Sequence, residues 1–201
     1  MSRILEPTPD ALREAAKVLR DGGVVAYPTE TVYGLAADPF NPEALRRLFA
    51  IKQRSDTKPV LLIVSSEEQL ELVAAPLSDR AERCIHAFWP GPVSLVLSAL
   101  EELPPEIASQ GKVCVRCTAH EVAAGLCAAF GAPVTSTSAN LSGQPPATTA
   151  KAACLPGVDL VLDGGDLPPF TPSTVYDPDA RLILRDGAVG VDELRALVER
   201  D

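Results

Sequence analysis

Two short runs of polar side chains could together bind a phosphate group. The first is Lys52-Gln53-Arg54, followed closely by Lys58, and it supplies positive charge in a chain whose net charge is -9. The second is Ser136-Thr137-Ser138-Ala139-Asn140, which supplies hydroxyl and amide groups in what reads as a tight bend after a strand. Cations beside a hydroxyl-rich bend are typical of polyphosphate sites. The two runs therefore predict an anion site.

The common signatures of nucleotide and hydrolase sites are missing from the sequence. Gly111-Lys112 is not a P-loop, because Glu106 stands where the first glycine would be and Val113 follows the lysine. The chain contains no GxG run and no GxSxG run, which excludes a dinucleotide fingerprint and a nucleophile elbow. With only His86 and His120, a histidine-rich metal site is excluded as well. The phosphate site must be of another kind.

Cys114-Val115-Arg116-Cys117 raises two questions. The CxxC spacing fits a redox or zinc pair, but residues three apart on a strand point to opposite faces, so that reading requires a segment that is not a strand. Arg116 lies among apolar residues and therefore needs an anionic partner. That partner can be a carboxylate of the protein, in a structural ion pair, or a bound ligand.

The elements that must position these residues alternate along the chain. Helices are predicted from Thr8 to a stop at Gly22, and at 41–51, 65–73, 78–88, 121–130 and 191–198. Strands are predicted at 24–27, 60–64, 93–97, 113–117, 132–135, 158–162, 173–176 and 182–184. This alternation indicates an α/β protein with a mixed, twisted sheet and flanking helices, in one domain over residues 1–201.

Composition narrows the class of protein. The 201 residues are 46% hydrophobic, but no apolar run approaches the roughly 20 residues that span a bilayer, and the N-terminus lacks an apolar signal core. Five thinly spread cysteines suit a reducing compartment. We expect a soluble, cytoplasmic protein with no membrane partner. The net charge of -9 argues against a broad nucleic-acid surface but leaves room for a local cationic cleft.

In chain order, these runs resemble the TsaC/YrdC family of L-threonylcarbamoyladenylate synthases. The matching runs cover almost the whole chain, at 27–35, 52–54, 58–59, 89–94, 115–116, 136–143, 172–175 and 184–185. The pairing of a KxR run with a later SxN run is specific in that order. The resemblance implies the short, single-domain form, with a YrdC-like fold and a concave cationic cleft.

The resemblance also implies an activity. The family is a nucleotidyltransferase that makes threonylcarbamoyl-AMP and pyrophosphate from L-threonine, bicarbonate and ATP, with Mg²⁺ accompanying the ATP. The product feeds a separate transferase that forms N6-threonylcarbamoyladenosine in tRNA, and a weak tRNA contact is compatible with this role. Catalysis is expected from positioning and charge stabilisation. Neither a covalent nucleophile nor a protein metal ligand is assigned.

The family's site residues carry over to matching positions of this chain. Those implied for ATP are Lys52, Arg54, Lys58, Ser138, Asn140 and Arg185. Those implied for threonine are Thr31, Arg116, Ser136 and Ser173, with Arg116 holding the carboxylate. Ile63 stands where many relatives have a histidine, so one threonine-side contact is expected to differ.

Two alternatives use the same residues. A non-catalytic RNA-binding or translation-associated module could hold RNA backbone in the cationic cleft. The acidic net charge and the lack of aromatic residues near Lys52 count against it. A carbamoyl-transfer domain of a larger maturation factor is the other, and the absence of zinc-finger cysteines favours a freestanding synthase over it.

Overall fold

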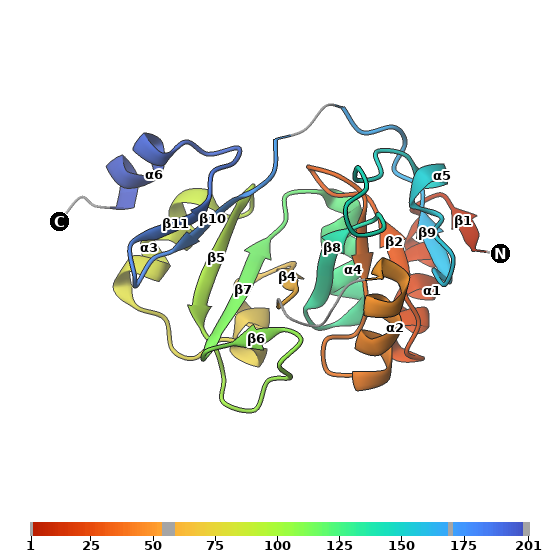
Figure 1. The fold of residues 1–201 in the computed structure, drawn as a ribbon, viewed down its shortest axis with the longest axis horizontal. Helices are drawn as coiled ribbons and strands as arrows, with labels where there is room; N and C mark the ends of the chain where they lie inside the picture. The colour runs from red at the N-terminus through yellow and green to blue at the C-terminus, as the bar shows by residue number, and fades with distance from the viewer. Residues whose placement is uncertain (1, 54–58, 169–170, 199–201) are drawn as a thin grey trace.

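A mixed β-sheet runs through the molecule from end to end (Figure 1). The computed structural model describes residues 2–53, 59–168 and 171–198. The strands are β1 (Arg3–Leu5), β2 (Val25–Tyr27), β3 (Gly34–Ala36), β4 (Leu61–Val64), β5 (Val93–Ser98), β6 (Ala108–Ser109), β7 (Lys112–Cys117), β8 (Val134–Ser138), β9 (Leu160–Leu162), β10 (Thr174–Asp177) and β11 (Leu182–Arg185). The helices are α1 (Pro9–Arg20), α2 (Pro42–Lys52), α3 (Asp79–Phe88), α4 (Glu121–Phe130), α5 (Ala150–Ala153) and α6 (Val191–Val198), with a 3-10 helix η1 (Glu67–Leu72).

The strand order brings together segments far apart in sequence. It runs β1-β9-β2-β3-β8-β4-β7-β5-β10-β11, and β6 pairs with β7. The β1–β9, β2–β9, β4–β7 and β5–β10 pairs are parallel, and the others are antiparallel. The N-terminus lies at the β1 edge, and α6 lies beyond the opposite edge (Figure 1). The prediction of an α/β fold with a mixed sheet and flanking helices is confirmed.

Helices cover both faces of one half of the sheet. On β2, Val25 and Tyr27 pack into a core with α1 and α4, whereas Ala26 packs into another core with α2 and α5. This alternation follows from the two-residue period of a strand. Every residue of β2 is accordingly buried, as expected for a strand with two covered faces.

The other half of the sheet has one face covered by α3 and α6. Val113, Val115 and Cys117 of β7 pack into that core, together with alternate residues of β5. The intervening residues of β7, Cys114 and Arg116, must then point to the opposite face. The candidate site described below lies on that face of the sheet.

The two ends of helix α2 explain where Lys52 is placed. Helix α2 begins where the Asn41 side chain accepts hydrogen bonds from the backbone N–H groups of Glu43 and Ala44. It ends at Gln53, which adopts a left-handed conformation with φ 49°. Lys52 is therefore the last helical residue, at the turn into the following segment.

The structure decides between the two readings of the CxxC run and corrects two expectations. Cys114 and Cys117 lie on one strand, so the redox or zinc reading of CxxC is wrong, and all five cysteines are free. No group of three or more His, Cys, Asp or Glu residues that could hold a metal occurs in the described residues. Ser136-Thr137-Ser138 belongs to β8 rather than to a bend. The segment predicted as a helix at 65–73 is the 3-10 helix η1.

The sequence pattern did not predict four short elements of the fold. Strands β1, β3 and β6 and helix α5 were not predicted, and each has only two to four residues. Elements this short carry too few residues for a periodic signal, and their pairing depends on distant partners. Across the described residues, no helix is long and apolar enough to cross a membrane.

Candidate active site

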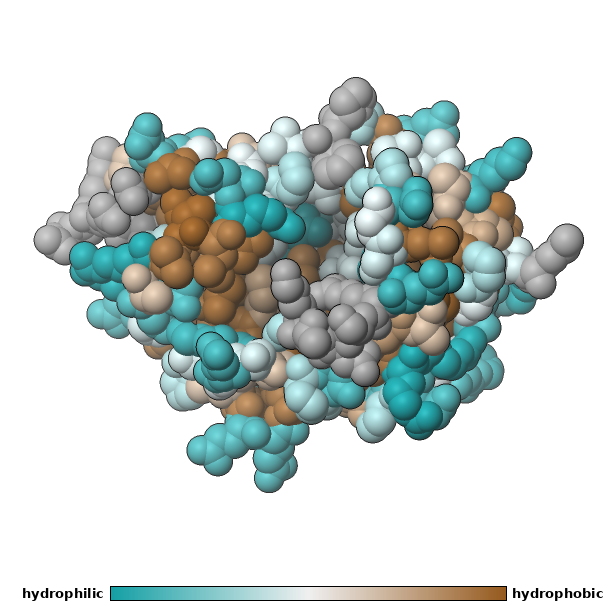
Figure 2. Space-filling view, in the orientation of Figure 1, coloured by the Kyte–Doolittle hydropathy of each residue, from teal (hydrophilic) through white to brown (hydrophobic). Residues whose placement is uncertain are grey.

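A cavity of about 390 Å³ opens over the sheet, and its described lining residues come from strands and loops. It lies in the hollow at the middle of the face shown in Figure 2. Its described lining is rich in hydroxyl groups, which come from Thr29, Thr31, Ser94, Ser136, Thr137, Ser138 and Ser173. The cations among its described lining residues are Arg116 and Arg185. Such a lining can donate many hydrogen bonds to an anionic ligand.

Strand β8 brings its hydroxyls to the cavity by pairing on both sides. Ser136 is paired with Leu61 of β4, and Ser138 is paired with Gly34 of β3. The side chains of Ser136 and Ser138 share one face, because they lie two residues apart on a strand. Both residues line the cavity, as does Gly34.

The turn between β2 and β3 presents Thr31. The hydroxyl of Thr29 accepts hydrogen bonds from the backbone N–H of Thr31 and of Val32 at 3.2 Å each, and it donates to the carbonyl of Val32 at 2.7 Å. Thr29 is 2% exposed, so its hydroxyl is the internal support of the turn. It also holds the Thr31 hydroxyl 3.0 Å away, at the cavity wall.

Arg116 has a protein partner and also lines the cavity. Its Nη1 donates to Oε1 of Glu30 in an ion pair, and Thr118 Oγ1 donates to the other carboxylate oxygen at 2.8 Å. The structural ion pair is therefore confirmed. However, Nε of Arg116 is buried without a hydrogen-bond partner in the described part of the chain. The predicted ligand role of Arg116 is compatible with this pair and stays a prediction.

Ser173 and Arg185 form a second polar group on the cavity wall. Arg185 Nε donates to the Ser173 carbonyl at 3.0 Å, and Nη2 donates to its hydroxyl at 2.8 Å. The Ser173 hydroxyl also lies 2.9 Å from that of Ser94, which comes from β5. Burial, followed by the nearby Arg116 charge, lowers the pKa of Arg185. Two like charges on one cavity wall favour an anionic ligand.

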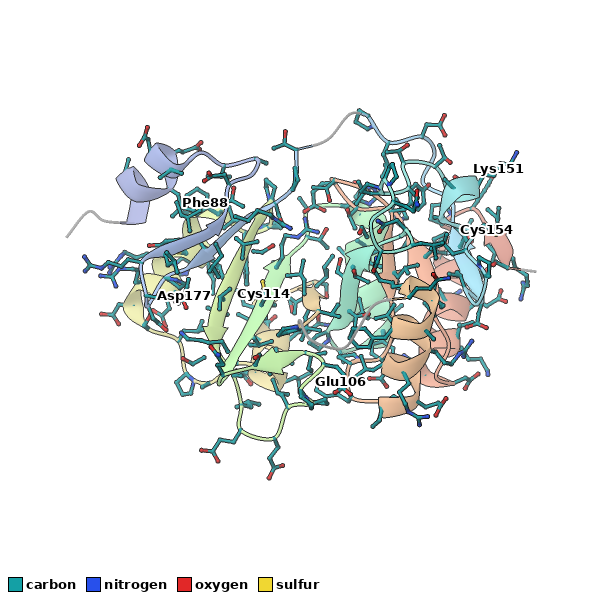
Figure 3. The ribbon with its side chains drawn as sticks, viewed as in Figure 1. Phe88, Glu106, Cys114, Lys151, Cys154 and Asp177 are labelled. Carbon is teal, nitrogen blue, oxygen red and sulfur yellow. The ribbon has the colours of Figure 1, made fainter. Side chains whose placement is uncertain are left out.

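Cys114 is on the same wall, but its thiol is poorly suited to act as a nucleophile. In Figure 3 it lies on β7 in the centre of the molecule, and it lines the cavity. Burial raises the pKa of the Cys114 thiol to about 12. The thiol is therefore protonated at neutral pH, which disfavours both covalent chemistry and metal binding.

Lys52 contacts the SxN run and holds it together, and its predicted role in phosphate binding stays a prediction. Its ammonium group donates to the carbonyls of Ser138 and Asn140 and to Asn140 Oδ1, which is 3.0 Å away. The Ser138 hydroxyl donates to the same Oδ1 at 2.6 Å. Neither Lys52 nor Asn140 is among the described residues that line the cavity. Arg54 and Lys58 lie outside the described residues.

Four further residues shape the site, and none of them is among the site residues carried over from the family pattern. Thr29, Ser94 and Cys114 line the cavity, and Glu30 binds Arg116. Thr29 and Glu30 lie beside Thr31 in sequence, which is the signal that could have pointed to them. Ile63, in contrast, is fully buried in the core with α1 and α4 and is not part of the cavity lining.

Gly187 supports the Ser173 segment by close contact, and its replacement should be costly. A Cβ atom at this position would lie 2.3 Å from the Pro172 carbonyl oxygen and 2.4 Å from the Thr174 nitrogen. We expect Gly187→Ala to lower the free energy of unfolding by about 1–3 kcal/mol through overpacking, as measured by urea unfolding. Gly190→Ala is the matched control, because a Cβ there meets nothing within 4 Å. Equal stability of the two variants would contradict the prediction.

The comparisons with known proteins agree with one another. The Sua5/YciO/YrdC family model, described as "Telomere recombination", matches residues 17–187. A curated relative from Coxiella burnetii (strain RSA 493), named threonylcarbamoyl-AMP synthase, is 39% identical over 179 residues, which are 87% of this chain and 96% of the relative. A relative of the same name from Pyrococcus abyssi is 36% identical over 93% of this chain and 57% of its own length.

Solved structures give the same result. The crystal structure of P. abyssi Sua5 complexed with L-threonine superposes with a TM-score of 0.90 at 33% identity, covering 98% of this chain and 60% of that one. E. coli YciO superposes with a TM-score of 0.84 at 26% identity, covering 96% of this chain and 100% of that one. The family match spans most of the chain and includes the segments that build the cavity. The chain therefore belongs to the Sua5/YciO/YrdC family.

Proposed function

We propose that this chain is a threonylcarbamoyl-AMP synthase, a nucleotidyltransferase that acts on L-threonine, bicarbonate and ATP. The observation that carries the proposal is the cavity lining. Buried Arg116, whose Nε has no partner among the described residues, lies among hydroxyl groups from four segments of the chain. The relatives named threonylcarbamoyl-AMP synthase support it, since one aligns over 87% of this chain at 39% identity.

The reaction needs no protein nucleophile. The ammonium group of threonine and bicarbonate give a carbamate with loss of one water and one proton, and the new bond joins nitrogen to carbon. A carbamate oxygen then attacks the α-phosphorus of ATP, and the bond to the β-phosphate oxygen breaks, releasing pyrophosphate. The protonated state of Cys114 and the hydroxyl-rich lining are consistent with catalysis by positioning.

In this proposal, the residues divide between two ligands. The threonine carboxylate binds Arg116, and its remaining polar groups meet Thr31, Ser136 and Ser173. The triphosphate and nucleotide meet the residues assigned to ATP by the family pattern, which are Lys52, Arg54, Lys58, Ser138, Asn140 and Arg185. The contact of Lys52 with Ser138 and Asn140 supports the grouping of these three.

Mg²⁺ would enter with ATP and neutralise charge on its phosphates. The described lining offers hydroxyl oxygens but no carboxylate, so the phosphates themselves would supply most ligands of the ion. The product would pass to a separate tRNA-modifying transferase, and we place the protein in the cytoplasm. The RNA-binding alternative gains no support, because no aromatic side chain lines the described cavity on which a base could stack.

The direct test is pyrophosphate release by the purified protein. With ATP, Mg²⁺, L-threonine and bicarbonate all present, we expect release together with a product that has the mass of threonylcarbamoyl-AMP. Omission of threonine or of bicarbonate should return the rate to background. Release that is independent of threonine, or no release with all four present, would reject the proposal.

A further inference from the structure

Glu30 is a charged residue beside the cavity that the proposed chemistry has not used. Its side chain is 19% exposed, and that of Arg116 is 3% exposed, so the ion pair between them is largely buried. Glu30 is absent from the lining of the cavity, whereas its neighbours Thr29 and Thr31 are part of it. The carboxylate therefore approaches Arg116 from outside the space available to a ligand.

The way in which Glu30 holds the guanidinium leaves one edge of it unused. Glu30 accepts from Nη1 of Arg116. The Nε–H of an arginine lies beside its Nη2 and forms a separate two-donor edge with it, which matches the spacing of a carboxylate. Nε has no partner among the described residues, although it is buried. A buried donor without a partner costs free energy unless a ligand accepts its hydrogen bond.

Both oxygens of the Glu30 carboxylate are fixed. Oε1 accepts from Arg116, and Oε2 accepts from Thr118 Oγ1 at 2.8 Å. The Thr118 hydroxyl in turn accepts from the backbone N–H of His120, the N-cap residue of α4, at 3.2 Å. The carboxylate is thus attached to β7 on one side and to the start of a helix on the other. It cannot swing away without breaking one of these part-buried hydrogen bonds.

We propose that Glu30 is a positioning residue that orients Arg116, so that its Nε edge is presented to the carboxylate of the amino-acid substrate. The identity of that substrate rests on the proposed function, but the orienting role does not. In the opposite arrangement, the substrate carboxylate would displace Glu30 from Arg116. The Glu30 carboxylate would then lose its cation and keep only the buried Thr118 hydroxyl as a partner.

The orienting role can be tested without any ligand. In protein labelled with ¹⁵N-arginine, and with the Arg116 signals identified by their loss in Arg116→Lys, we expect slow rotation of the guanidinium and separate Nη signals. Glu30→Ala should merge or broaden them, and Glu30→Gln, which keeps an acceptor, should largely retain them. Asp159→Asn is the matched control, because it weakens the half-exposed Arg47 ion pair elsewhere. Arg116 signals unchanged in Glu30→Ala would overturn the inference.

The kinetic test separates positioning from competition. Glu30→Ala should raise the KM for L-threonine roughly tenfold or more and leave the KM for ATP unchanged, as expected when one charge-assisted contact is lost. Thr118→Val should act in the same direction to a smaller extent, and it keeps the test available if Glu30→Ala fails to fold. A lower KM for threonine would mean that Glu30 competes with the substrate, which overturns the inference.

The two proposals fail in different ways. If the unmodified protein shows no threonine-dependent pyrophosphate release, the proposed function is wrong, and the arginine spectra still decide whether Glu30 orients Arg116. If release occurs, but Glu30→Ala lowers thermal stability without changing the KM for threonine, the function stands and Glu30 is only structural.

Discussion

Lys52→Met should abolish pyrophosphate release and also destabilise the protein. Lys52 is 4% exposed, and its ammonium group donates to three oxygens of Ser138 and Asn140. Methionine fills the same space but leaves those acceptors without their charged partner. Because a hydrogen bond to a charged group contributes about 1.5–3 kcal/mol, we expect a loss of at least about 2 kcal/mol in the free energy of unfolding. Urea unfolding and a pyrophosphate assay measure the two effects.

Arg46→Met is the control for this experiment. Arg46 lies on the same helix, but its side chain is 70% exposed and pairs with Glu43 on the surface. Exposed pairs contribute little to stability, so activity and unfolding should stay close to those of the unmodified protein. A Lys52→Met protein that matches Arg46→Met in both assays would show that the SxN run keeps its shape without the lysine.

Arg116→Lys should reduce kcat/KM for threonine by about 10- to 100-fold in a folded protein. Lysine keeps the positive charge beside Glu30 but lacks the planar fork that binds two carboxylates at once. Arg116→Ala should go further, because it leaves Glu30 partly buried without its cation, and breaking such a pair typically costs about 3–5 kcal/mol. Steady-state kinetics and thermal unfolding of both variants separate the two effects.

The contrast between the Arg116 variants is what tests the site. From the sequence alone, Arg116→Ala would be expected to fold normally if the arginine served only a ligand. The ion pair with Glu30 changes that expectation, so unfolding of Arg116→Ala no longer argues against a ligand role. A folded Arg116→Lys protein with unchanged kcat/KM for threonine would argue against a ligand role for Arg116.

Much of the site could be predicted because its residues lie at the ends of recognisable elements. The apolar run around Arg116 correctly predicted a strand, and strand geometry then excluded the CxxC pair. The Asn41-Pro42 start of α2 fixed the position of Lys52 at the other end of the helix. The meeting of Lys52 with Ser138 followed from the two runs that first suggested an anion site.

The rest depends on contacts that sequence patterns do not carry. Glu30 and Arg116 are 86 residues apart, and nothing local in either segment specifies their pairing. The hydroxyl-rich run of β8 looked like a bend because serine is common in turns, whereas pairing with β3 and β4 makes it a strand. Strand β3 has only three residues, and its antiparallel partners are set by the tertiary fold.

The place of β9 has a consequence for how the protein is made. This strand lies between β1 and β2, both of which leave the ribosome more than 130 residues earlier. At about 5–20 residues per second, those two N-terminal strands wait about 7 to 30 seconds for the neighbour that joins them. The cavity waits longer still, because Arg185 is synthesised later. During that interval, the nascent chain has unpaired strand edges and should be a client for chaperones that shield them.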